Sequence, residues 1–330
     1  MLRVVRVGLV ACIVQLAARS VVEAQPWVPE KGEGTATFTY QNYYVRGHFD
    51  PKGNENRNGA THSKVVVSEI DFGLAHSIGL TARLPFVASK YTGPSVYFVG
   101  DIPTYPGPLD DGTYHGALQD LYLEARRMFA PRAVVVAPFA GVTLPTHDYE
   151  THGEAVPGRH RRDLEVGASA APDFESFLPH SYAYVRYTWA AAERNEGFPS
   201  VRSLIDLEGG HDLTSWFGVR GLLFWQIRHK GPTLDELNAH DWEGHDRFIV
   251  SSYFNVGGGT SLRLMRSTEL SATWIATVSG KGGAHVGRML AVSATWSFGG
   301  GFTGLGARPD ITNQGRVIAP PRTSSIARHP

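Results

Sequence analysis

Apolar and polar residues alternate along most of this chain in segments of strand length. The first segment sets Ala36, Phe38, Tyr40 and Tyr44 on one face against Thr35, Thr37, Thr39 and Gln41 on the other. A period of two is the signature of β-strands that have one apolar and one polar face. Twelve such segments lie between residue 35 and Phe298, although the segment from Ala133 to Leu144 is apolar on both faces. The pattern predicts an all-β fold.

Short and long connections alternate between these segments. Short ones, of about four to eight residues, lie near His76, Ala130, Phe174, Thr214 and Ser267. Long ones, rich in Gly, Pro, Asp, Asn and His, cover roughly residues 47–63, 91–115, 147–161, 193–202, 229–245 and 280–287. This alternation predicts a transmembrane antiparallel up-and-down β-barrel of about 12 strands, with short turns and both termini in the periplasm.

The first 24 residues have the features of an export signal. Arg3 and Arg6 precede an apolar stretch from Val7 to Ala18, and small residues before Gln25 predict cleavage after Ala24. Leu9-Val10-Ala11-Cys12 also matches a lipoprotein box, which is the alternative interpretation. We therefore expect a signal peptide over residues 1–24, a barrel over 25–298, and a disordered C-terminal tail over 299–330. The expected location is the bacterial outer membrane.

A soluble β-sandwich or lipocalin-like barrel would also show alternating strands, but three features favour a membrane barrel. Aromatic residues recur near the ends of the apolar face, at Tyr44, Trp189, Trp225, Trp274 and Trp296. The opposite face carries many charges, which a sandwich core could not bury unpaired. The last segment ends in the alternating aromatic residues Trp296 and Phe298, which we expect to be recognised by the barrel-assembly machinery.

Several short motifs give the chain a family resemblance. They are Gly73-Leu74, Leu84-Pro85-Phe86-Val87, Gly116 with Asp120, Pro138-Phe139-Ala140-Gly141-Val142, Leu144-Pro145-Thr146 and Trp296-Ser297-Phe298. Together they resemble the outer-membrane barrels of the meta-pathway phenol-degradation family. Gln119 and His147 stand where that family usually has Gly. The resemblance implies a barrel that passes aromatic or other apolar small molecules through the outer membrane.

The polar face of the predicted strands carries charges of both signs. The expected lumen-lining residues are the carboxylates Glu69, Asp71, Asp120, Glu124, Asp163, Glu165, Asp206 and Glu208, and the arginines Arg83, Arg126, Arg186, Arg220, Arg228, Arg247 and Arg263. Carboxylates fall in pairs on every second strand, so neighbouring strands present opposite signs. Two interpretations remain open: a ladder of salt bridges that rigidifies the interior, and a polar filter for a permeating solute.

Other functions find less support in the sequence. Lys and Arg total 31, as do Asp and Glu, so no basic excess would attract nucleic acid. Arginines beside the paired carboxylates argue against a glycosidase. His62 and Ser63 are adjacent on a strand and face opposite ways, which argues against an outer-membrane phospholipase. The loop histidines lack a tight metal-ligand spacing. We therefore expect no enzyme activity, cofactor or metal.

The loop near residues 91–115 is unusually apolar for a surface loop. Tyr91, Tyr97, Phe98, Ile102 and Tyr105 lie there among four prolines. We expect these five residues to cover the extracellular mouth and to contact or gate an apolar solute. The predicted function is passive uptake of small apolar or aromatic solutes. The alternative is a non-transporting structural or surface-recognition barrel whose lumen is closed by salt bridges.

The aromatic end of the last strand gives the first testable prediction. Phe298→Ala should reduce the fraction of the chain inserted into the outer membrane, because the assembly signal would lose its terminal aromatic ring. Deletion of residues 303–330 should leave insertion unchanged. Both are measured by membrane fractionation, and a loss of insertion on tail deletion would place the signal in the tail instead.

Overall fold

The computed structural model describes residues 26–299 except 58, 95–96, 100–101, 105–106, 131–133, 174–176, 196 and 233–248. The predicted signal peptide and C-terminal tail lie outside these residues. Among the described residues, no helix is long and apolar enough to cross a membrane.

The strands follow the alternating segments of the sequence. Their bounds are β1 (Gly34–Phe49), β2 (Glu55–Asn56), β3 (Ala60–Ala75), β4 (Ile78–Thr92), β5 (Tyr97–Val99), β6 (Ile102–Thr104), β7 (His115–Leu118), β8 (Leu121–Arg127), β9 (Val134–Leu144), β10 (Asp163–Pro172), β11 (Ser181–Asn195), β12 (Phe198–Asp212), β13 (Phe217–Lys230), β14 (Ser252–Met265), β15 (Thr268–Lys281) and β16 (Gly283–Phe298). Gln119 and Asp120 separate β7 from β8, and both parts pair with β4.

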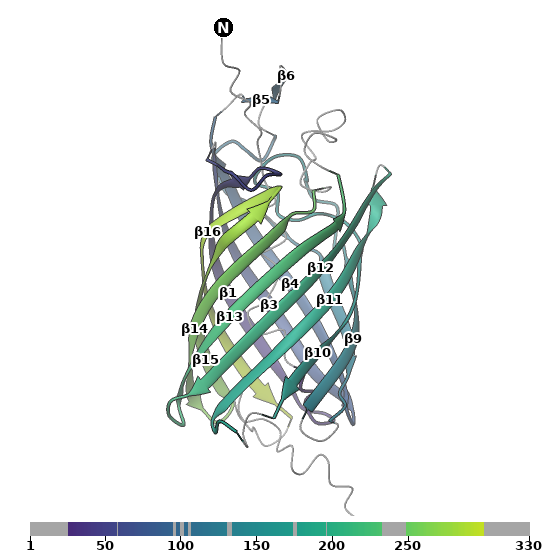
Figure 1. Ribbon diagram of the computed structural model, residues 1–330, viewed down its shortest axis with the longest axis vertical. Helices are drawn as coiled ribbons and strands as arrows, with labels where there is room; N and C mark the ends of the chain where they lie inside the picture. Colours follow the sequence, from purple (N-terminus) through teal and green to yellow (C-terminus); the bar gives the residue numbers. More distant parts are fainter. Residues whose placement is uncertain are drawn as a thin grey trace, which may run out of the picture.

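The sheet closes on itself. Each strand pairs antiparallel with its neighbour in sequence, and β16 returns to β1, from Gly34↔Phe298 to Phe49↔Gly283. Counting β7 and β8 as one strand, the result is a closed barrel of 12 tilted strands (Figure 1). The predicted fold class is confirmed. The hairpin of β5 and β6 lies beyond the upper rim of the wall (Figure 1).

The barrel is apolar outside and polar inside. Phe38 on β1 is 59% exposed and Trp225 on β13 is 48% exposed, whereas Gln41 on β1 is fully buried in the lumen. Trp189, Trp274 and Trp296 also lie on the outer surface. An exposed apolar belt with aromatic residues fits a lipid environment and would be unfavourable in water. Even β9, apolar on both faces, buries Phe139 inward and exposes Val142 outward.

Two of the six predicted long loops are absent. Strands β11 and β12 stay paired as far as Asn195↔Phe198, and β15 is joined to β16 by Gly282 alone, at a φ of +61°. The predictions of loops over 193–202 and 280–287 were therefore wrong. Their Gly and polar residues suggested loops, but neighbouring strands extend equally far and satisfy the backbone hydrogen bonds, as in His48↔Ala284.

Closure of the sheet predicts resistance to detergent. The barrel leaves no unpaired wall strand from which unfolding could begin, so unboiled protein should run faster on a detergent gel than boiled protein. Substituting Tyr40, at the middle of the β1–β16 seam, by Pro should remove that difference because it eliminates a ladder hydrogen bond. Equal mobilities of the boiled and unboiled wild-type protein would contradict a closed barrel.

Candidate functional site

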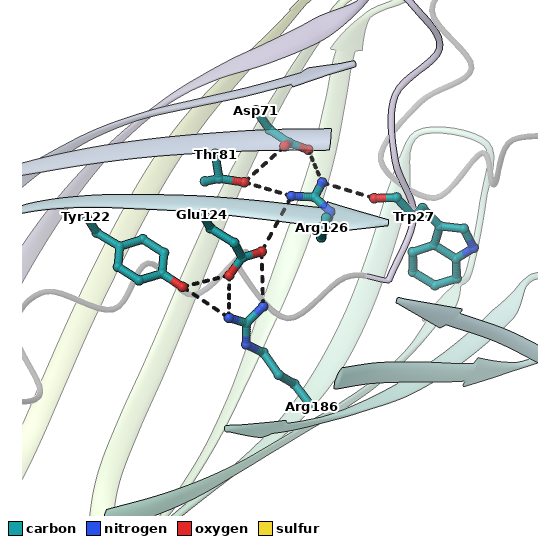
Figure 2. A network of polar contacts seen from close by, with 7 residues as sticks. All are labelled: Trp27, Asp71, Thr81, Tyr122, Glu124, Arg126 and Arg186. Carbon is teal, nitrogen blue, oxygen red and sulfur yellow. Dashed lines mark hydrogen bonds and ion pairs between the residues drawn. The ribbon is translucent and has the colours of Figure 1, made fainter. Parts of the chain in front are cut away.

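A network of charges crosses the periplasmic half of the lumen. Arg126 on β8 binds Asp71 on β3 at 2.5 Å and donates to Thr81 on β4 at 2.7 Å (Figure 2). Thr81 in turn donates to Asp71 at 3.1 Å. Arg126 is 7% exposed, so this pair is shielded from bulk solvent. The network joins β3 to β8 over the intervening strand β4.

A second part of the network spans a wider distance. Arg186 on β11 reaches Glu124 on β8 at 2.5 Å, and Tyr122 donates to the same carboxylate at 2.6 Å (Figure 2). Strands β9 and β10 lie between these partners, and the Arg186 guanidinium lies 3.5 Å from the centre of the Phe139 ring on β9. Gly141 makes room, since a Cβ there would lie 2.6 Å from the Tyr122 hydroxyl. The side chains of Arg186 and Glu124 therefore meet across two intervening strands.

Further ion pairs lie in the lumen around Arg202 and Arg220. Arg202 on β12 binds Asp163 on β10 at 2.6 Å and lies 3.7 Å from Glu165. Arg220 on β13 lies 3.8 Å from Glu208, which also accepts hydrogen bonds from the hydroxyls of Tyr182 and Tyr184. Arg202 was missed in the sequence analysis because it fell in an expected loop.

Most of the predicted lumen-lining residues lie in the lumen, but not all. Those buried there are Glu69, Arg83, Asp120, Glu124, Arg126, Glu165, Arg186, Asp206 and Glu208, with Asp71, Asp163 and Arg220 in the ion pairs above. Arg228 is exposed beyond the last β13–β14 residue pair, Gln226↔Tyr253, so its lumenal placement was wrong. Arg263 lies at the periplasmic rim and donates to the Ser215 carbonyl, while Arg247 lies outside the described residues.

A cluster of apolar side chains lies in the extracellular half of the lumen, which the sequence analysis did not foresee. Tyr43, Val65, Val67, Val87 and Ile275 are buried together on inward-facing strand positions. Leu222 and Met289 belong to the same cluster, and Phe224 packs against it. The signal was present in the sequence, because these residues share the parity of the lumenal charges. We call this region the apolar chamber.

An irregular segment folds inward and closes the mouth above the chamber. Residues 151–161 are almost entirely buried, and Val156 packs within the same apolar cluster as Val65 and Val87. Asp110 holds this segment: its carboxylate accepts from the backbone N–H groups of Glu154 at 2.8 Å and Ala155 at 3.0 Å. Burial raises the pKa of Asp110, and these hydrogen bonds oppose that shift. We call residues 151–161 the mouth segment.

The five residues expected to gate the mouth, in the loop near residues 91–115, are described only in part. Tyr91 is buried at the mouth, at 3% exposure. The backbones of Tyr97, Phe98 and Ile102 form the β5–β6 hairpin, whereas Tyr105 lies outside the described residues. A solute contact by these five residues remains a prediction. The same loop contributes Asp110 and Leu109, which packs against the apolar cluster.

The chain just before β1 enters the periplasmic end of the lumen. Val28 is 3% exposed and packs with Met128 and Val135, and the Trp27 ring lies edge-on to Tyr184 at 6.0 Å. Arg126 donates to the Trp27 carbonyl at 3.1 Å (Figure 2). The lumen is therefore constricted at both ends. Trp27 and Val28 are a paired apolar signal that the sequence analysis left unassigned.

The alternative chemistries considered for the sequence find little geometric support. Ser63 faces the lumen and shares a hydrogen bond with Ser89 at 2.7 Å, whereas His62 lies on the other face against Tyr44. Among the loop histidines, His152 binds Glu150 at 2.6 Å and His160 lies 3.7 Å from Asp148. Within the described part of the chain, no three His, Cys, Asp or Glu residues converge to hold a metal ion.

Comparison with known proteins identifies the fold. No family model and no curated protein sequence matches the chain. Among solved structures, an outer membrane channel from Pseudomonas putida F1 has a TM-score of 0.63 at 11% identity, over 84% of this chain and 100% of that one. The β domain of the Bordetella autotransporter BrkA has a TM-score of 0.46 at 10% identity, over 81% of this chain and 100% of that one. The chain has the fold of an outer-membrane barrel, and its apolar belt places it in that membrane.

The charge network predicts a large stability effect at Arg186. Arg186→Met should destabilise the barrel by about 3–5 kcal/mol, because it leaves the Glu124 carboxylate buried without its main partner. The readout is the urea concentration at which refolded protein loses its fast gel mobility. Arg127→Met, an exposed position at the end of β8, is the matched control and should change little. Equal effects of the two substitutions would show that the pair is not structural.

Proposed function

We propose that this barrel is an outer-membrane channel or binding pore for passive uptake of small apolar or aromatic solutes. The observation that carries the proposal is the apolar chamber beneath the mouth segment. A barrel lumen open to water is ordinarily polar. Here a cluster of aliphatic and aromatic side chains lines part of the extracellular half, so a solute of low polarity could leave water and enter the chamber.

The charged half of the lumen fits the same function. Its carboxylates and guanidinium groups are paired with one another, so they offer few free charges to attract an ion. In this proposal the ion pairs brace the wall, as a salt-bridge ladder would, and leave a passage that favours neutral solutes. The main chain before β1 and the mouth segment narrow this passage from its two ends.

The comparison with solved structures also supports a channel function. The solved structure with the TM-score of 0.63 is described as an outer membrane channel, and it has a comparable barrel over its whole length. The runner-up function is a non-transporting structural or surface-recognition barrel. It would require that the lumen stay closed even when the mouth segment is released.

The mouth segment provides the test. Asp110→Ala removes the carboxylate that holds residues 151–161, at a cost of about 1.5–3 kcal/mol per charge-assisted hydrogen bond, so the mouth should open more often. Ion conductance through single channels in a planar bilayer should rise several-fold. Asp111→Ala is the matched control, because Asp111 is exposed and bonds only to Thr113 and His115 in its own loop.

Uptake into liposomes of an uncharged aromatic probe, followed in parallel, distinguishes the two functions. Uptake by the wild-type barrel above that of empty liposomes supports transport. A double variant, Asp110→Ala with Trp27→Ala, releases both constrictions. If this variant is folded by gel mobility and neither conducts ions nor admits the probe, the lumen is sealed by its salt bridges and the structural function holds instead.

A further inference from the structure

A row of basic and aromatic side chains crosses the outer surface of the barrel near its extracellular rim. The strand register places Arg288 on β16 opposite Tyr44 on β1, and Tyr44 opposite His62 on β3. His62 in turn lies opposite Lys90 on β4. Lys64 lies on the same face of β3 as His62, two residues nearer the middle of the barrel. We call Lys64, Lys90 and Arg288 the basic patch.

The basic patch faces outward, at the level where the apolar belt ends. Val65 is buried in the lumen, so its neighbour Lys64 points to the outside. Val66 follows Lys64 by two residues and is 43% exposed in the belt. Leu290 follows Arg288 by two residues on β16 and is 52% exposed. The charges therefore lie where the hydrocarbon of the bilayer gives way to lipid headgroups.

Aromatic rings hold the three cations in place. The Nζ atoms of Lys64 and Lys90 lie 4.6 Å and 5.0 Å from the centre of one ring, that of Tyr114. Tyr114 precedes β7 and is 41% exposed. The Arg288 guanidinium lies 5.8 Å from the centre of the Tyr44 ring. A ring face attracts a cation but supplies no anionic oxygen, so the positive charges are left to attract an anion.

No carboxylate of the described residues forms an ion pair with the basic patch. The carboxylate of Glu55, on the short strand β2 beside β1, is engaged by other bases. Arg46 and Arg57 each lie 2.9 Å from its Oε1, and His285 lies 3.0 Å from the same atom. Three cations held close together repel one another unless an anion lies among them.

The charge is a local feature of this side of the barrel. On β11, β12 and β13 an outward-facing row places Trp189 opposite Ser203, and Ser203 opposite Ile227. None of these three residues is charged. A general attraction to anionic headgroups would distribute basic residues around the rim, whereas a cluster on four consecutive strands fits one particular headgroup.

We propose that the basic patch binds the phosphate groups of lipid A, the anchor of the lipopolysaccharide in the outer leaflet of the bacterial outer membrane. Lipid A joins anionic phosphates to several acyl chains, so it matches the cations and the apolar belt beside them. The guanidinium of Arg288 can bind a phosphate through two parallel hydrogen bonds, and the two lysines add compact positive charges. This site lies on the outer wall and is independent of transport through the lumen.

Native mass spectrometry of the full-length refolded barrel in detergent, titrated with diphosphoryl lipid A, tests the proposal. The triple variant Lys64→Gln, Lys90→Gln, Arg288→Gln should bind lipid A at least about tenfold more weakly, because its charge-assisted hydrogen bonds are lost. The matched control is the triple variant Arg194→Gln, Arg228→Gln, Lys230→Gln. It removes the same number of charges from exposed extracellular ends of β11 and β13, and should bind as the wild type does. Gel mobility verifies that each variant is folded.

Three further probes, used on the wild-type barrel, separate the possible sources of the phosphate. Dephosphorylated lipid A retains the acyl chains and should bind at least about tenfold more weakly. Phosphatidylglycerol, with one phosphate, should also bind more weakly than diphosphoryl lipid A. Inorganic phosphate, equimolar with the lipid, should not displace it, because a free ion lacks the chains that contact the belt. These results do not depend on any variant folding.

Each opposite result would overturn the proposal. Equal binding of dephosphorylated lipid A would show that the acyl chains alone hold the lipid. Equal binding of phosphatidylglycerol would make the patch a general site for anionic lipids, and displacement by equimolar inorganic phosphate would make it a site for free anions. Equal weakening in the two triple variants would show that only the net charge of the rim matters.

Discussion

The rest of this structure depends on one constraint: within a bilayer, every backbone amide and carbonyl must find its hydrogen bond inside the protein. The chain meets it by pairing β16 with β1 over almost their full lengths, from Gly34↔Phe298 to Phe49↔Gly283. Closure then fixes which side of each strand meets lipid. Because successive side chains alternate, one face of every strand becomes the outer belt, and the other is withdrawn from lipid and can carry charge.

The withdrawn face is divided into two chemical environments. In the periplasmic half, Arg126 and Arg186 neutralise buried carboxylates on β3 and β8. In the extracellular half, the same parity of positions carries Tyr43, Val65 and Ile275. The ion pairs of the periplasmic half connect strands that are not neighbours and so stiffen the wall, and the Arg202–Asp163 pair does the same nearer the extracellular end. A small cavity lined by Tyr43, Ile275 and Met289 borders the apolar cluster.

Both ends of the lumen are narrowed by irregular backbone. Such backbone would leave unpaired polar groups in lipid, but it is tolerated inside the lumen. At the mouth, two N–H groups of the buried segment, those of Glu154 and Ala155, donate to the carboxylate of Asp110. At the periplasmic end, the Gly32 N–H donates to the Gly73 carbonyl, and the Gly73 N–H donates to the Glu33 carbonyl. A Cβ at Gly73 would collide with the Glu30 carbonyl. Neither segment is part of the wall, so either can move without breaking the closed sheet.

Period-two alternation by itself determined the number of strands, their order and the face that each residue presents, because the pleat of a strand allows only two directions for a side chain. It therefore placed the charges that form the ion pairs, such as Asp71, Arg126 and Arg186, on one shared side of the strands. It could not say which charges meet. Arg186 binds Glu124 over two intervening strands, a pairing set by the barrel's curvature and by the small residue Gly141 between them.

Sequence composition also predicted loops where strands continue. Residues 193–202 and 280–287 are polar and Gly-containing, yet most of them lie in strands paired with a neighbour: β11 with β12, β15 with β14 and β16 with β1. A strand's length depends on whether its neighbour extends equally far. Likewise, only the tertiary structure decided that Arg228 is exposed at the end of β13 and that residues 151–161 are buried against the apolar cluster. Local sequence specifies the direction of a side chain. Its surroundings are supplied by strands far away in the chain, and these come together only when the barrel closes.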